Sequence, residues 1–232
     1  MEITNYFLYL LFAFLPSILW LLFYLRKDEK PEPKLMILKV FFFGMVFALL
    51  ALFFQIILLI FLKFTNLPQN ISQIIEIFLI VAFIEEFLKF LVVKIVVFKS
   101  KELDEPVDGM IYMIVSALGF ATTENLLLFF QYLNNIWDTL ATLSLLRFLS
   151  ATLLHTLSSA ILGFFVGLSI LKKKKMLTLI TIGILLATSL HGTYNLFIIK
   201  GEEKIVFIIL FAFLLISMYI VLNLFKKIKQ KK

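Results

Sequence analysis

Apolar residues occur in seven long runs along the chain, separated by short polar breaks. The runs cover residues 6–25, 36–62, 73–98, 109–133, 141–171, 176–199 and 205–225. Each approaches or exceeds the roughly 20 residues that a helix needs to cross a bilayer. The pattern predicts an all-α fold, a polytopic transmembrane bundle of about seven helices, with residues 1–232 forming a single domain. The run 141–171 is too long for a perpendicular crossing, so it must tilt or begin outside the hydrocarbon.

The composition agrees with a membrane protein. The chain is 62% hydrophobic with a mean hydropathy of +1.05, whereas soluble domains are about 45–50% apolar. Cysteine is absent, which excludes disulfides and thiolate metal sites and leaves histidines and carboxylates as candidate ligands. The net charge of +7 would suggest nucleic acid in a soluble protein. Here the basic residues lie at helix ends, so we expect the lipid bilayer, and not nucleic acid, as the partner.

The basic residues also predict an orientation. One side of the predicted bundle collects 17 lysines and arginines, and the other side has 3. Because basic residues accumulate in cytoplasmic loops, this bias predicts a multi-pass cell-membrane protein with its C-terminus in the cytoplasm and its N-terminus outside. The first run continues into Arg26 and Lys27 without a small-residue cleavage site, so we expect a retained helix and not a cleaved signal peptide.

Six ionisable residues interrupt the apolar runs. Each charged group at mid-membrane costs roughly 2.5–3.5 kcal/mol on insertion scales. They are Glu85, Glu86, Lys89, Glu124, His155 and His191. At a rise of about 1.5 Å per residue, four of them lie about 12 to 21 Å from the outer ends of four different spans. We therefore expect a shared layer at or somewhat outside the bilayer midplane.

In the third span, Lys89 follows Glu85 by four residues and Glu86 by three. At 100° per residue, its side chain falls angularly between the two carboxylates. One interpretation is a self-contained salt bridge that makes insertion easier. The other is a catalytic pair, because two close carboxylates in a low dielectric do not both ionise easily. One of them can then act as a base while the other holds a proton.

In the fourth span, Glu124 has no basic residue three or four positions away, so its partner must come from another helix. Small residues around it allow helices to approach closely, which leaves a polar packing contact as the alternative to a site. Arg147 lies nearer the outer end of the fifth span, where a simple snorkelling role is expected.

The fifth and sixth spans each carry one histidine. His191 and Asn195 share a face at i, i+4, which suits hydrogen bonding to a developing oxyanion. His155 shares a face with Ser159, on a helix whose Gly163 and Gly167 form a stripe for close packing. Either histidine could instead be a hydrogen-bonded core residue.

Several chemistries can be compared with this set. There is no His-Glu-x-x-His motif and no Gly-x-Gly-Asp motif. Three glutamates, two histidines and an asparagine suit activation of water by a carboxylate, with His and Asn stabilising a tetrahedral oxyanion. The same set could hold Zn²⁺ through two histidines and a carboxylate. A proton-coupled transporter or channel, and a catalytically silent membrane partner, are the alternatives from other classes.

Three motifs together resemble those of the PrsW family of intramembrane proteases, which is distantly similar to the CAAX-prenyl endoproteases. They are Glu85-Glu86-x-x-Lys89, Phe120-x-x-x-Glu124-Asn125 and His191-x-x-x-Asn195. The resemblance extends to Leu-Arg-Lys-Asp-x-x-Pro-Glu-Pro-Lys at 25–34 and Asp-Glu-Pro-Val-Asp-Gly at 104–109. It covers most of the chain from residue 15 to 197.

The resemblance implies an intramembrane endopeptidase with a glutamate-type mechanism and no cofactor. Glu85 would be the water-activating base and Glu86 its partner, while His191 and Asn195 would bind the oxyanion. Glu124 stands where the prenyl proteases carry a histidine. The resemblance also implies a substrate: a single-pass membrane protein, such as an anti-sigma factor cut on its extracytoplasmic side in a stress cascade. Supporting positions would be Lys89, Asn125 and His155.

Overall fold

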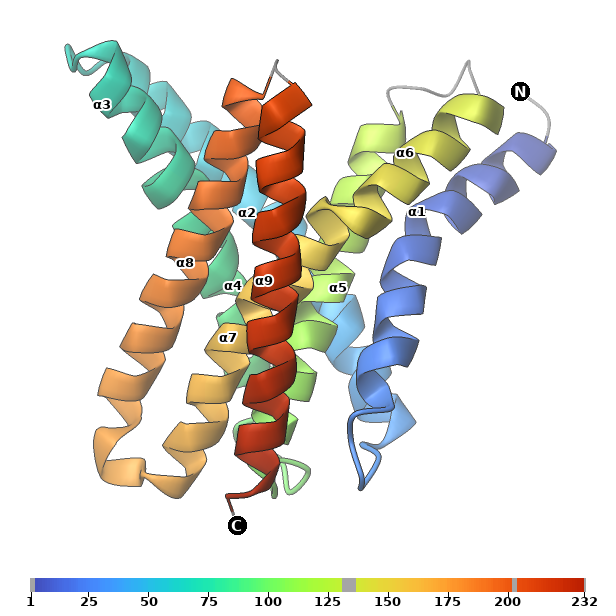
Figure 1. Cartoon of the computed structure of the whole chain (residues 1–232), viewed down its shortest axis with the longest axis vertical. Helices are drawn as coiled ribbons and strands as arrows, with labels where there is room; N and C mark the ends of the chain where they lie inside the picture. Colours follow the sequence, from blue (N-terminus) through green and yellow to red (C-terminus); the bar gives the residue numbers. More distant parts are fainter. Residues whose placement is uncertain (1–2, 131–136, 202–203, 232) are drawn as a thin grey trace.

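The computed structural model describes residues 3–130, 137–201 and 204–231, and within them it is helical with no strand. The elements are α1 (Ile3–Leu25), α2 (Lys34–Lys63), α3 (Gln69–Ile74), the π-helix η1 (Ile75–Phe83), α4 (Ile84–Val96), α5 (Asp108–Phe130), α6 (Trp137–Leu149), α7 (Ala151–Leu171), the 3₁₀ turn η2 (Lys173–Lys175), α8 (Met176–Lys200) and α9 (Lys204–Lys229). The helices run up and down one bundle (Figure 1). The predicted all-α fold is confirmed.

Six helical stretches are long and apolar enough to cross a membrane. The third predicted span corresponds to α3, η1 and α4, which follow one another without a break from residue 69 to 96. This span carries Glu85, Glu86 and Lys89 within five residues, which lowers its hydropathy. The predicted end of the fourth span, at residues 131–133, lies outside the described residues.

The fifth predicted span differs from a single tilted helix. It consists of α6 and α7, which meet at Ser150, where φ is −127° and ψ is −91°. Because this conformation is far from the helical region, the chain changes direction there. Figure 1 shows α6 leaning away from the axis of α7. The excess length of the 141–171 run is thus accommodated by a break in the helix as well as by inclination.

Helix α5 lies at the centre of the bundle, between α7, α2 and α1. All but a few of its side chains are buried. Glycines let its neighbours approach closely: a Cβ added at Gly163 on α7 would lie 2.6 Å from the carbonyl oxygen of Gly109 on α5. Gly167 makes the same kind of close approach, to Pro106. The predicted small-residue packing stripe, Gly163 and Gly167 on α7, is confirmed.

The loops richest in basic residues gather at one end of the bundle. Lys30, between α1 and α2, forms an ion pair with Glu105, between α4 and α5. Lys229 at the end of α9 pairs with Glu29 at 3.0 Å. The η2 turn and the C-terminus lie at this same end in Figure 1. This arrangement agrees with the predicted separation of basic and apolar ends, while the side of the membrane that each end faces stays a prediction.

Candidate active site

Lys89 is the cationic centre of the buried polar residues. Its Nζ lies 2.8 Å from Glu86 Oε1 and 3.5 Å from Glu85 Oε2, on the same helix α4. The predicted i, i+3 and i, i+4 pairs are therefore both present. The ammonium also reaches across to α7, 2.8 Å from His155 Nδ1, and lies over the ring of Phe120 at 4.7 Å from the centroid. Its side chain is fully buried.

Glu86 is surrounded by hydrogen-bond donors. Its Oε1 accepts from Lys89 Nζ, and Ser158 Oγ donates to the same oxygen at 3.0 Å. Ser159 Oγ donates to Oε2 at 3.1 Å. His191 Nδ1 lies 2.9 Å from Oε1. Because an ionised carboxylate only accepts, we assign the hydrogen of His191 to Nδ1, which leaves a lone pair on Nε2.

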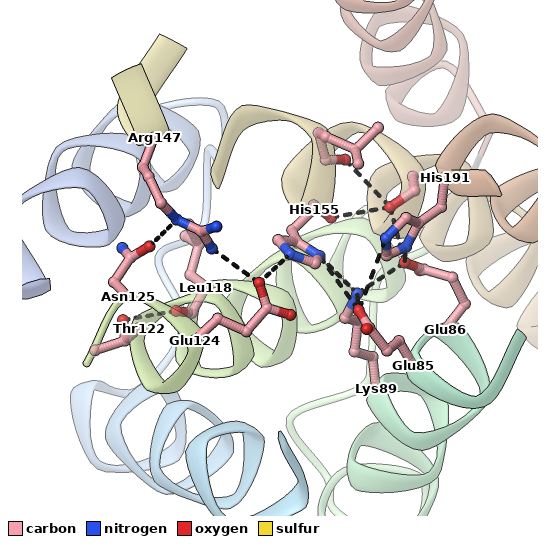
Figure 2. Close-up of polar contacts among 12 residues, drawn as sticks. Glu85, Glu86, Lys89, Leu118, Thr122, Glu124, Asn125, Arg147, His155 and His191 are labelled. Carbon is pink, nitrogen blue, oxygen red and sulfur yellow. Dashed lines mark hydrogen bonds and ion pairs between the residues drawn. The ribbon is translucent and has the colours of Figure 1, made fainter. Parts of the chain in front are cut away.

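Glu85, the adjacent residue, has a different environment. Its Oε1 accepts a hydrogen bond from Gln55 Nε2 of α2 at 3.1 Å. Its Oε2 is buried and has no hydrogen-bond partner among the described residues. That oxygen lies 3.7 Å from His191 Nε2 and 4.0 Å from His155 Nδ1. The two imidazole rings are nearly perpendicular, with centroids 5.1 Å apart. This carboxylate oxygen therefore faces Lys89 and both histidines at 3.5 to 4.0 Å and accepts a hydrogen bond from none of them (Figure 2).

Glu124 extends the polar network toward α6. His155 Nε2 lies 2.9 Å from Glu124 Oε2, and Arg147 Nη2 donates to the same oxygen at 2.8 Å. Arg147 also donates from Nε to the side-chain oxygen of Asn125. Asn125 in turn donates to the carbonyl oxygen of Ala13 on α1, at 3.1 Å. Since Lys89 donates to His155 Nδ1, we assign the hydrogen of His155 to Nε2, which then donates to Glu124.

The predicted shared depth is confirmed by these contacts, which join residues of α4, α5, α7 and α8 in one layer (Figure 2). Glu124 was expected to have a partner on another helix, and it has two, Arg147 on α6 and His155 on α7. The network is most open at Glu124, whose side chain is 27% exposed, against 9% for Glu85.

A family model and several similar proteins all point to the same family. The sequence model of a family described as "PrsW family intramembrane metalloprotease" matches residues 32–222. A "Protease PrsW" of Geobacillus kaustophilus is 33% identical over 78% of this chain and 75% of its own length. Proteins of the same name from Oceanobacillus iheyensis and Bacillus subtilis are 32% and 31% identical, over 84% and 75% of this chain and 84% and 74% of their own lengths. No solved structure matches the chain.

The chain belongs to the PrsW family. It is a multi-pass membrane protein and a peptidase that acts on a membrane protein substrate in the bilayer. Membership in the PrsW family favours this activity over the transporter, the channel and the silent partner. The named residues of the three motifs are brought together by the fold, with one exception.

The exception is Asn195. It lies on α8, four residues beyond His191, and is half-buried. No hydrogen bond of its side chain is recorded within the described part of the chain. Four residues of helix place it about 6 Å along α8 from His191. Helical spacing puts Asn195 on the same face of α8 as His191, but its amide has no hydrogen-bond partner among the described residues.

Other residues of this PrsW-family site were missed or misjudged from the sequence. Arg147 was expected only to snorkel, and this was wrong, because it is bound to Glu124 and Asn125. Gln55 and Ser158 were not expected at all. Gln55 could have been found, since it is an amide deep inside the apolar run 36–62. Ser158 gave no comparable signal, because serines pack within membrane helices without any ligand role.

The donor set of the site fits a divalent metal. Glu85, His155 and His191 each offer a ligand atom, and these atoms lie within 4.8 Å of one another. Two histidines and a glutamate are a frequent set for catalytic zinc. The second nitrogen of each histidine is held by a carboxylate, Glu124 or Glu86, as is usual for metal-binding histidines. Glu85 Oε2, the oxygen nearest both histidines, accepts no hydrogen bond from the described residues and could be the Glu85 ligand.

Lys89 competes with a metal ion for the same position. His155 Nδ1 has a single lone pair, which faces Lys89 Nζ at 2.8 Å. A metal ion on that nitrogen requires the ammonium to move away, and it would also repel the ammonium. The expectation of a site without metal stays a prediction, which chelation tests.

Proposed function

We propose that this PrsW-family protease hydrolyses peptide bonds with a water molecule activated at Glu85. The observation that carries the proposal is the buried, unpartnered Oε2 of Glu85 facing His155 and His191. An oxygen that accepts no hydrogen bond from the protein is available to accept one from water. General-base catalysis of this kind contributes about 10²- to 10⁴-fold to the rate.

In the proposed reaction, Glu85 Oε2 takes a proton from the water as its oxygen attacks the scissile carbonyl carbon. The same carboxyl then delivers the proton to the leaving amine nitrogen when the C–N bond breaks. His191 takes up a proton from solvent at Nε2 before the attack, and Glu86, which holds its Nδ1–H, stabilises the resulting imidazolium. In that form it donates a hydrogen bond to the developing oxyanion.

We assign a second oxyanion contact to Asn195. Its amide has no recorded protein partner, and it follows His191 by one turn of α8. A substrate carbonyl between the two side chains would accept from both. Loss of one such donor typically lowers kcat by about 10²- to 10³-fold.

Glu124, Arg147 and Asn125 act as positioning residues in this proposal. Glu124 fixes the tautomer of His155 and the direction of its Nδ1. Arg147 of α6 donates hydrogen bonds to Glu124 and to Asn125, which are neighbours on α5, and so holds Glu124 in place. Lys89 supplies positive charge beside both α4 carboxylates, which lowers the cost of burying them.

A divalent metal, when bound, would be held by Glu85, His155 and His191 and would polarise the substrate carbonyl and acidify bound water. With or without the metal, Glu86 orients His191 and Glu124 orients His155. Glu85 contacts the reacting water in both cases, as a base or as a ligand beside it.

The substrate is proposed to be a single-pass membrane protein, such as an anti-sigma factor, cut near its extracytoplasmic end. The 17-to-3 distribution of basic residues supports a cytoplasmic C-terminus. In this orientation α6, the helix that carries Arg147, extends toward the outer end of the bundle, opposite the C-terminus (Figure 1).

The test is cleavage of single-pass substrates with extracytoplasmic juxtamembrane segments by purified protein in detergent. His191→Ala is expected to abolish cleavage, and Asn195→Ala to lower kcat by about 10²-fold. Ser189→Ala is the matched control, because Ser189 lies on the exposed side of α8 and bonds only its own helix. Cleavage that survives in His191→Ala would overturn the site.

A strong chelator separates the two forms of the site. Cleavage unaffected by the chelator supports Glu85 as the base without metal. Cleavage lost to the chelator and restored by Zn²⁺ assigns Glu85, His155 and His191 as ligands.

A further inference from the structure

A second group of acidic residues lies at the basic end of the bundle, away from the candidate active site. Asp28 follows α1, Glu32 precedes α2, and Asp108 is the first residue of α5. Each offers a carboxylate oxygen, and the three oxygens lie within 4.8 Å of one another. Two of the sequence motifs that the protease mechanism leaves unused, at 25–34 and 104–109, supply them.

Each carboxylate is held in place through one of its oxygens. The backbone N–H of Lys30 donates to Asp28 Oδ1 at 3.0 Å. The backbone N–H of Glu105 donates to Asp108 Oδ2 at 2.6 Å. The hydroxyl of Tyr112, one turn along α5, donates to Glu32 Oε2. Three acidic groups are thus oriented toward one another by neutral donors.

The remaining oxygen of Asp28 lacks a partner. Asp28 is only 8% exposed, and its Oδ2 is buried without a hydrogen bond from the described residues. The nearest loop cations are engaged elsewhere, Lys30 with Glu105 and Lys229 with Glu29. Burial, the charges of Asp108 and Asp28 and a hydrogen bond with Asp108 together raise the pKa of Glu32 to about 8, against the hydrogen bond from Tyr112, which lowers it. The cluster is therefore short of positive charge.

We propose that Asp28, Glu32 and Asp108 bind a hard divalent cation, Mg²⁺ or Ca²⁺. Both ions take carboxylate oxygens as ligands and complete their coordination with water. A bound ion would supply the charge that the cluster lacks and a partner for Asp28 Oδ2. It would also connect the α1–α2 loop to the start of α5, the central helix that carries Glu124.

This site differs in chemistry from the Glu85 site, which contains two imidazoles. Hard cations prefer all-oxygen sites, whereas imidazole suits zinc and other transition metals. Ions such as Ca²⁺ and Tb³⁺ therefore report on the acidic cluster selectively. Tyr112 is in direct contact with Glu32, which places an aromatic sensitiser beside the proposed ion.

The experiment titrates the purified full-length protein with Tb³⁺ and records its luminescence under tyrosine excitation. We expect saturable luminescence that Ca²⁺ or Mg²⁺ displaces, and the better competitor identifies the ion preferred. Asp28→Asn should weaken Tb³⁺ binding at least tenfold. Glu29→Gln, in the same loop but exposed and paired with Lys229, should change it less than twofold. Glu85→Gln should leave it unchanged.

Two results would overturn the proposal. One is the absence of saturable luminescence in the wild type, which would leave a carboxyl cluster that shares protons instead of a cation. The other is equal Tb³⁺ affinity in the wild type and Asp28→Asn. Should Asp28→Asn fail to fold, Glu32→Gln gives the same comparison, because Glu32 is only partly buried.

Discussion

Glu85 and Glu86 are neighbours in sequence, yet their surroundings are opposite. Glu86 is fully buried and accepts hydrogen bonds from Lys89, His191, Ser158 and Ser159. Glu85 accepts one hydrogen bond, from Gln55, and its other oxygen accepts none from the described residues, although Lys89 Nζ lies 3.5 Å from it. About 100° of rotation around α4 separates a carboxylate that binds α7 and α8 to α4 from one whose second oxygen accepts no hydrogen bond from the described residues.

The comparison shows that two adjacent glutamates on one helix differ in how many hydrogen bonds the protein gives them. An ionised carboxylate has about four acceptor positions, and at Glu86 four protein donors reach it, three at Oε1 and one at Oε2. That side chain therefore orients His191 and binds α7 and α8 to α4. At Glu85, Oε2 accepts no hydrogen bond from the described residues and lies 3.7 Å from His191 Nε2 and 4.0 Å from His155 Nδ1.

The largest expected effect is on catalysis at Glu85. Glu85→Gln should lower cleavage by about 10³-fold or more, because an amide cannot act as a base. It should leave the thermal unfolding temperature in detergent nearly unchanged, because the side-chain oxygen of the new glutamine can still accept the hydrogen bond from Gln55 Nε2. Glu76→Gln, the same substitution at an exposed position on η1, is the control. Full activity in Glu85→Gln would show that the free oxygen is not where water is activated.

A second expected effect is on stability at Glu86. Glu86→Gln leaves Lys89 buried beside a neutral amide and should cost about 3 kcal/mol of unfolding free energy, as for broken buried ion pairs. Activity should fall as well, because His191 loses the group that holds Nδ1. Equilibrium unfolding in mixed micelles measures the difference. Equal stability of the Glu85 and Glu86 variants would contradict the division of roles.

The smallest expected effect tests the donors of Glu86 one at a time. Ser158→Ala removes one of four hydrogen bonds and should cost about 1 kcal/mol, with cleavage reduced only modestly. Ser169→Ala on the same helix, where the hydroxyl bonds only the Val166 carbonyl, is the matched control. A loss of cleavage as large as that of Glu85→Gln would place Ser158 in the reaction itself.

The sequence by itself determined the helices and the local geometry of the site. Unbroken apolar runs of bilayer length allow only helices, because backbone polar groups in lipid must be satisfied within the segment. The spacing of Glu85, Glu86 and Lys89 fixed their ion pairs, since helical periodicity alone puts i, i+3 and i, i+4 side chains together. The same arithmetic along four spans placed the glutamates and histidines at one depth.

Only the tertiary structure decided which side chains meet. The rotation of each helix about its axis, and the break at Ser150, depend on packing between helices and not on local spacing. These features bring Arg147 to Glu124 and direct Nδ1 of His191 to Glu86 instead of Glu85. A difference of one residue in register, about 100° around a helix, would exchange the free carboxylate for the bound one.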